Sequence, residues 1–392
     1  MSYHRTHITP TGLYVHVPFC IHRCIYCAFY LEELGTGPIA ERLERTFDRP
    51  GFIDALGLEI QQLPSVFSPE TVYFGGGTPT ELSLVDLRAM FSLVRQWINC
   101  SAIREYTVEA NPGTLTREKA ELLMEFGINR VSLGLQAMDN QTLEFLSRIH
   151  RVEEGLETYR MLREVGFTNI NLDLIICVPG RSDEQLMREL DELIALEPDH
   201  VSCYGLEFDE GAPLTELLEQ GRFEALDEDA AARQYELTVD RLEAAGIHQY
   251  EISNFARPGS ESRHNLNYWS AGEYIGCGPS ASSHVKGRRY KNLPNLKGWQ
   301  ACLASGESPV VDNEHLSPEA KAREGLMLAL RQRAGITSDA LKQRTGFDLL
   351  GLLGGAIPDW IENGYMEWVG EHLRLTRAGM LASDAIFVDV IA

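Results

Sequence analysis

The chain has 392 residues, 44% of them hydrophobic, and its 57 acidic against 35 basic residues give a formal net charge of −22. Such a chain can bury a substantial core, and its negative charge argues against a nucleic-acid partner bound over a broad surface. No apolar run approaches the roughly 18 residues of a membrane helix, and the first residues include no apolar signal segment. These features predict a cytoplasmic protein without an integral membrane segment.

Short apolar runs alternate with longer helical patterns through the first part of the chain. The expected strands are residues 12–19, 71–74, 106–110, 130–136, 169–178 and 200–208. The expected helices are residues 82–97, 116–126, 140–149, 153–165 and 182–196. Strands that are apolar on both faces, such as NLDLIICV, are typical of a parallel sheet covered by helices. This α/β series favours a partial (β/α)6 barrel, with a flat doubly wound sheet as the alternative, and either one binds ligands at the carboxyl ends of its strands.

The pattern changes twice after this series. A long amphipathic helix and the run YEISNFA complete a first domain, residues 1–257, and a connecting region is expected at residues 258–316. Residues 317–392 predict a smaller, winged-helix-like module with helices and a hairpin at YMEWVGEHLRLT. Its 8 basic and 10 acidic residues leave no basic footprint for DNA. Residues 32–49 predict an irregular surface excursion.

Three of the eight cysteines follow the first expected strand closely. Cys20, Cys24 and Cys27 have a C-x3-C-x2-C spacing, and a tight loop with these gaps can aim three thiolates at one metal centre. Soft sulfur ligands suit zinc or an iron–sulfur cluster. Buried thiols and a zinc knuckle completed by His16 or His22 are the alternatives, although structural zinc usually takes ligands in paired spacings. The pattern favours a cluster that keeps one iron open.

This loop, the aromatic Tyr26 before its last cysteine and the later GGGTPT resemble the radical S-adenosylmethionine superfamily. In that family the open iron of a 4Fe–4S cluster is chelated by the amino and carboxylate groups of S-adenosylmethionine, and the reduced cluster cleaves the sulfonium to give a 5′-deoxyadenosyl radical. The resemblance implies that Cys20, Cys24 and Cys27 hold the cluster. The residues that it assigns to S-adenosylmethionine are Tyr14, Tyr26, Gly76, Gly77, Thr78, Glu109, Gln136, Arg148 and Asp173.

Motifs along nearly the whole chain resemble one branch of that superfamily, the HemN/HemW group. These motifs are YVHVPFC, YFGGGTPT, EANPGT, RVSLGLQ, NLDLI, HVSCYGL and YEISNFA. Three features favour a heme chaperone within the branch over a coproporphyrinogen dehydrogenase. Phe29 stands where the dehydrogenase usually has a fourth cysteine, only 19 residues precede Cys20, and residues 264–269 match the HNxxYW motif associated with heme binding.

The HNxxYW match implies a heme site at His264, Tyr268 and Trp269. A histidine can ligate heme iron and flanking aromatic rings can contact the macrocycle, although His264 alone would be interpreted as a hydrogen-bonded loop histidine. The basic tract KGRRYK is either a solvated loop or a partner for heme propionates. The resemblance thus implies a chaperone that delivers heme to acceptor hemoproteins. The alternatives are oxygen-independent coproporphyrinogen III dehydrogenation and another radical enzyme acting on a tetrapyrrole.

Overall fold

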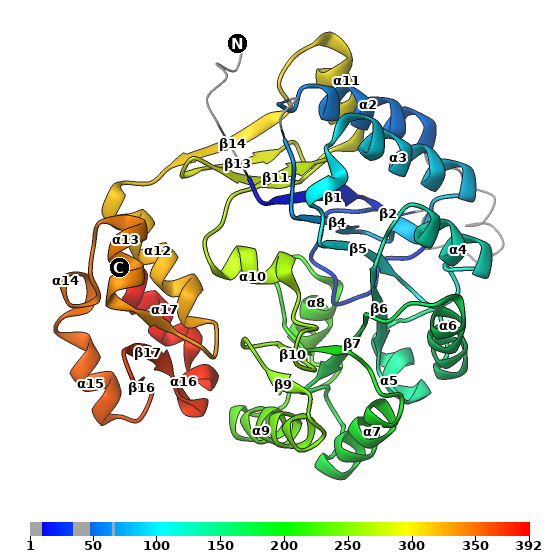
Figure 1. Ribbon diagram of the computed structural model, residues 1–392. Helices are drawn as coiled ribbons and strands as arrows, with labels where there is room; N and C mark the ends of the chain where they lie inside the picture. Colours follow the sequence, from blue (N-terminus) through cyan, green and yellow to red (C-terminus); the bar gives the residue numbers. More distant parts are fainter. Residues whose placement is uncertain (1–9, 34–47, 65–66) are drawn as a thin grey trace.

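The computed structural model describes residues 10–33, 48–64 and 67–392 (Figure 1). Its main feature is a twelve-stranded sheet with the order β14-β13-β12-β11-β1-β4-β5-β6-β7-β8-β10-β9. Six of these strands, all parallel, follow one another in chain order: β1 (Gly12–Val17), β4 (Thr71–Gly76), β5 (Glu105–Ala110), β6 (Arg130–Gln136), β7 (Ile170–Ile176) and β8 (His200–Gly205). Each new strand is added on the same side, whereas a doubly wound sheet reverses direction. The partial (β/α)6 barrel is therefore confirmed.

Most of the helices after these strands lie on the outer side of the curved sheet (Figure 1). They are α2 (Arg49–Gln61), α3 (Leu84–Trp97), α4 (Arg117–Glu125), α6 (Val152–Val165), α7 (Asp183–Ala195) and α9 (Glu228–Ala244). Two shorter helices, α5 (Asn140–Phe145) and α8 (Pro213–Glu219), belong to the same series, and the Leu214 N–H in the first turn of α8 donates to the Ile25 carbonyl oxygen of the cysteine loop. Polar caps determine several starts: the side chains of Ser83, Thr116 and Ser182 each accept a hydrogen bond from a backbone N–H in the first turn. The strands and most helices match the predicted ranges to within a few residues.

One predicted helix is too long. The helix expected over residues 140–149 ends at Phe145, and Ser147 then adopts a left-handed backbone with φ of 54°. This turn directs the following residue, Arg148, toward the interior of the barrel, where it contacts Cys24. A contact distant in sequence has overridden the local helical pattern.

The expected connecting region, residues 258–316, adds four strands to the same sheet. It contains α10 (Arg263–Trp269), β11 (Tyr274–Cys277), β12 (Ser282–Val285), β13 (Arg288–Asn292), α11 (Leu296–Ser305) and β14 (Val310–His315). Strand β11 pairs parallel with β1, so a late segment extends the sheet beyond the first strand. At the other edge, β10 (Asn254–Ala256) and β9 (His248–Gln249) pair antiparallel. The short strands β2 (Phe19–Cys20) and β3 (Glu32–Glu33) flank the cysteine loop, and residues 34–47 of the expected excursion lie outside the described residues.

The C-terminal module has its own core, separate from that of the sheet. It consists of a three-stranded sheet, β15 (Ile336–Thr337), β17 (His372–Leu375) and β16 (Met366–Val369), and of the helices α12 (Pro318–Leu330), α13 (Ser338–Thr345), α14 (Leu349–Leu353), α15 (Ala356–Glu362), α16 (Arg377–Leu381) and α17 (Ser383–Ile391). The predicted hairpin is β16–β17. The module lies beside α10, where the Arg331 guanidinium sits 4.5 Å from the Trp269 ring (Figure 1). Across the described ranges, every helix is too short or too polar to cross a bilayer.

Candidate functional site

A cavity of about 540 Å³ opens at the carboxyl ends of the parallel strands. It is lined by all three cysteines of the C-x3-C-x2-C loop. Eight of the nine residues assigned to S-adenosylmethionine also line it, namely Tyr26, Gly76, Gly77, Thr78, Glu109, Gln136, Arg148 and Asp173. The volume is typical of a small-molecule site, and the fold brings together residues that are far apart in the chain.

The three thiols share this cavity in a largely buried setting. Burial raises the pKa of Cys20 to about 12, and the nearby thiols of Cys24 and Cys27 add to the rise. Sulfur is the soft donor that an iron–sulfur cluster requires, so the donor chemistry fits. Among the described residues, no group of three Cys, His, Asp or Glu side chains meets the geometry of a metal site.

The two histidines of the zinc alternative, His16 and His22, have different surroundings. His16 Nδ1 lies 3.0 Å from the Tyr14 hydroxyl and Nε2 lies 2.9 Å from the Tyr30 carbonyl oxygen. His22 Nε2 lies 3.3 Å from the Ser147 hydroxyl and Nδ1 lies 3.3 Å from a Glu33 carboxylate oxygen. His16 does not line the large cavity, whereas His22 does, so His22 is the histidine of the zinc alternative that lies beside the three cysteines.

A chain of hydrogen bonds joins the cysteine loop to the glycine loop. Arg148 Nη1 donates to Cys24 Sγ at 3.3 Å, and Nη2 donates to Asn111 Oδ1 at 2.5 Å. Asn111 Nδ2 in turn donates to Thr78 Oγ1 at 2.7 Å, and Thr78 Oγ1 lies 3.4 Å from Cys20 Sγ. Asn111 is not among the residues predicted from the sequence, although it lies inside the EANPGT motif. Its position directly after a strand end is the signal that identifies it.

The glycine loop after β4 leaves no room for side chains. A Cβ atom at Gly77 would lie 2.7 Å from the Val17 carbonyl oxygen. Gly76 has φ of 103°, and a Cβ there would collide with the His16 ring. Glycine is therefore required for the backbone to approach the end of β1 and still line the cavity.

Two half-buried carboxylates line the cavity from β5 and β7. Glu109 accepts hydrogen bonds from the Tyr73 hydroxyl at 2.7 Å and from the Gly76 N–H at 3.1 Å. Burial raises the pKa of Glu109 to about 7 and also raises that of Asp173. Asp173 accepts from Asn171 Nδ2 at 2.7 Å. Carboxylates held at strand ends are suitable acceptors for ribose hydroxyls or an ammonium group.

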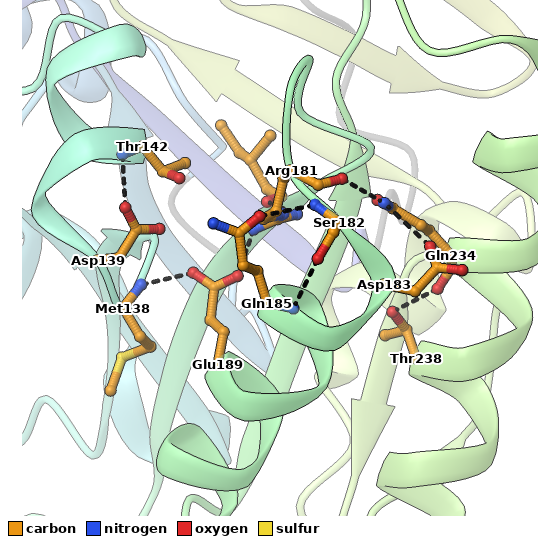
Figure 2. A network of polar contacts seen from close by, with 11 residues as sticks. Met138, Asp139, Thr142, Arg181, Ser182, Asp183, Gln185, Glu189, Gln234 and Thr238 are labelled. Carbon is orange, nitrogen blue, oxygen red and sulfur yellow. Dashed lines mark hydrogen bonds and ion pairs between the residues drawn. The ribbon is translucent and has the colours of Figure 1, made fainter.

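A buried polar network holds the loops that follow β6 and β7 (Figure 2). Arg181 and Glu189 form an ion pair with side chains only 3% and 4% exposed. Glu189 also accepts from the Met138 N–H at 2.5 Å, two residues after Gln136. Arg181 Nη2 donates to the Ile175 carbonyl oxygen at 3.0 Å, two residues after Asp173. The network thereby links the chain segments that carry the cavity-lining residues Gln136 and Asp173, and no motif in the sequence predicts it.

The HNxxYW motif associated with heme binding lies on α10, and its histidine is buried. His264 is 1% exposed and stacks on Tyr73 with ring centroids 5.0 Å apart. Its Nδ1 lies 2.8 Å from the Thr71 hydroxyl and its Nε2 lies 2.8 Å from the Tyr268 hydroxyl. Both ring nitrogens are thus occupied, so this conformation offers neither to a heme iron. Trp269 packs under Arg331.

Tyr14 is the assigned residue that lies outside the large cavity. It lines a neighbouring cavity of about 290 Å³, together with Tyr268. Tyr14 and Tyr73 have ring centroids 6.2 Å apart, and Tyr73 lines the large cavity. The structure therefore divides the assigned residues between two adjacent cavities.

The burial of His264 predicts a pH-dependent contribution to stability. Burial lowers its pKa to about 3, so the unfolded chain takes up a proton that the folded chain does not. The stabilisation is complete above pH 6.5, the ordinary histidine pKa, and is lost progressively as pH falls toward the folded pKa. The advantage of the wild type over His264→Gln in free energy of unfolding should therefore shrink by about 1.4 kcal/mol per pH unit below about pH 6.

Urea unfolding of both proteins at about pH 7.5, 6 and 5 checks this slope. The exposed His372→Gln variant controls for the loss of a histidine at the surface. An advantage that stays constant or grows as the pH falls would contradict the buried, neutral imidazole.

Comparison with known proteins identifies two matching families. The radical SAM superfamily model matches residues 14–193, and the HemN C-terminal domain model matches residues 316–382. The chain is 33% identical to the heme chaperone HemW of Bacillus subtilis, over 95% of this chain and 97% of that protein. It is 35% identical to HemW of Mycobacterium tuberculosis, over 96% and 94%.

One solved structure matches almost the entire chain. Coproporphyrinogen III oxidase (HemN) from Escherichia coli, a radical SAM enzyme, superimposes with a TM-score of 0.82 over 98% of this chain and 90% of that chain. The two sequences are 20% identical, so the match concerns the fold. It covers both the barrel and the C-terminal module.

Proposed function

The chain belongs to the HemN/HemW branch of the radical SAM superfamily, and on this basis we propose that it is a heme chaperone that binds a 4Fe–4S cluster, S-adenosylmethionine and heme. The observation that carries the proposal is the similarity along nearly the full length to proteins named as heme chaperones. Phe29 agrees with it, because its exposed ring lines the cavity where a dehydrogenase usually has a fourth cysteine. Acceptor hemoproteins are the proposed partners.

The residues of the large cavity have distinct parts in this proposal. Cys20, Cys24 and Cys27 hold the cluster, and Arg148 places a positive charge beside its sulfur ligands. The backbone of Gly76, Gly77 and Thr78 lies against the amino acid part of S-adenosylmethionine, and the carboxylates of Glu109 and Asp173 accept hydrogen bonds from it. When both are bound, cluster and S-adenosylmethionine supply one-electron chemistry.

A first experiment tests the binding of S-adenosylmethionine. In anaerobically reconstituted wild type, S-adenosylmethionine should change the electron paramagnetic resonance spectrum of the reduced cluster. Asp173→Asn should lower the affinity for S-adenosylmethionine roughly tenfold, because the loss of a charged acceptor costs about one strong hydrogen bond. The affinity is measured as the concentration that gives half of the spectral change. Its iron content should stay unchanged, since Asp173 is not a cluster ligand. A spectrum indifferent to saturating S-adenosylmethionine would contradict the assignment.

A second experiment separates the chaperone from the dehydrogenase. Purified protein should bind heme with a distinct Soret band and transfer it to an apo-hemoprotein. The reduced, reconstituted protein should form no protoporphyrinogen from coproporphyrinogen III in the presence of S-adenosylmethionine. Sustained turnover of coproporphyrinogen III without heme transfer would reverse the proposal in favour of the enzyme.

A further inference from the structure

The smaller cavity, of about 290 Å³, lies between β1, the end of the cysteine loop, α10 and strands β11–β13. Ala28 and Phe29 line both it and the larger cavity, so the two are neighbours. Phe29 is 68% exposed and therefore offers apolar surface at the boundary between the two cavities. A ligand in the smaller cavity would lie beside the proposed cofactor site.

The walls of this cavity are mainly aromatic. Tyr14, Tyr30, Tyr268 and Tyr274 all line it, and the rings of Tyr268 and Tyr274 meet edge to face with centroids 4.5 Å apart. Burial raises the pKa of Tyr14 and Tyr268 far above the ordinary value, so these phenols remain neutral. Flat, neutral aromatic walls favour a flat, largely apolar ligand.

Lys291 is the lysine that lines this cavity, and it brings a positive charge to it. It is half-buried on β13, and within the described ranges no carboxylate lies within ion-pair distance of its ammonium group. The neighbouring cations are engaged: Arg289 pairs with Glu324, and Arg288 donates to Asn313. Because the ammonium group of Lys291 has no carboxylate partner there, it is available for a charge-assisted hydrogen bond with an anionic group on the ligand.

We propose that this cavity binds one edge of a planar aromatic anion, with a carboxylate of the ligand on Lys291 and the ring system against Tyr14, Tyr268 and Tyr274. The inference rests on the proposed function, which identifies this ligand as the tetrapyrrole. The same proposal gives His264 a positioning role in place of iron ligation. Its Nε2 holds the Tyr268 hydroxyl at 2.8 Å, so His264 is a positioning residue that acts through Tyr268 and does not ligate iron.

Iron-free protoporphyrin IX is the decisive probe, because it has the ring and both carboxylates of heme but no metal to ligate. Lys291→Gln should weaken its binding roughly tenfold, the worth of one hydrogen-bonded ion pair. Lys297→Gln removes the same charge from an exposed position on α11 and should leave binding unchanged. Protoporphyrin dimethyl ester, which lacks the carboxylates, should bind equally to the wild type and to Lys291→Gln.

The role of His264 is tested with the same probe. If His264 positions Tyr268, His264→Gln should weaken heme and iron-free porphyrin by the same factor. If it ligates iron, only heme binding should fall, and the positioning role is overturned. Circular dichroism at the assay pH confirms that each variant is folded before its affinity is compared.

The failure of this inference is distinguishable from the failure of the proposed function. Wild-type protein that binds neither heme nor porphyrin would overturn both. The proposed function would hold if the wild-type protein binds heme and neither Lys291→Gln nor Tyr274→Leu changes the affinity. That result would nevertheless show that this cavity is not the heme site.

Discussion

Replacing Cys24 by alanine is expected to abolish the visible absorbance of the iron–sulfur cluster. The reconstituted wild type should hold about four irons and four sulfides per chain, and cysteine thiolates are the ligands that retain them. The loop offers three thiols, so the variant is left with two. Cys20→Ala and Cys27→Ala should behave alike, because all three thiols line the same cavity.

Iron and sulfide analysis after anaerobic reconstitution measures this effect. Cys302→Ala is the matched control, because Cys302 lies on α11 and does not line the cavity. It should retain the full cluster. A Cys24→Ala chain with unchanged iron content would show that the cysteine loop is not the cluster site, and the proposed function would lose its basis.

Arg181→Met is expected to lower the free energy of unfolding by about 3–5 kcal/mol, the usual cost of removing one partner from a buried ion pair. The variant leaves the Glu189 carboxylate, 4% exposed, without its cation (Figure 2). The double variant Arg181→Met, Glu189→Leu should regain much of the loss, since it leaves no unpaired charge in the interior.

Urea unfolding followed by circular dichroism gives these values. Glu125→Gln is a suitable control, because its ion pair with Arg88 is half exposed and screened by solvent, so its loss should change the free energy of unfolding far less. A loss from Arg181→Met no larger than that of the control would mean that solvent reaches the pair. The loops carrying Gln136 and Asp173 would then need another explanation for their position.

Much of the barrel could be predicted because its signals are local. Strand β6 begins and ends at the predicted residues, and α7 begins directly after Ser182, its predicted first residue and observed cap. Alternating apolar runs, capping side chains and glycine stops act within a few residues of one another. The segment with β11–β13 escaped prediction because its strands are short and mostly polar, and parallel pairing with β1 joins positions far apart in the chain.

The same distinction between local signals and contacts of distant residues applies to the candidate site. The sequence by itself determined that Cys20, Cys24 and Cys27 follow a first strand closely, and their spacing and residue type predict a site for a soft metal. Only the tertiary structure decided that Arg148 lies beyond the end of α5 and contacts Cys24, that Tyr14 lines a second cavity, and that both ring nitrogens of His264 face the hydroxyl groups of Thr71 and Tyr268. Each of these outcomes depends on which distant side chain meets a polar atom in the interior. Such pairing follows from packing and desolvation, which spacing along the chain does not encode.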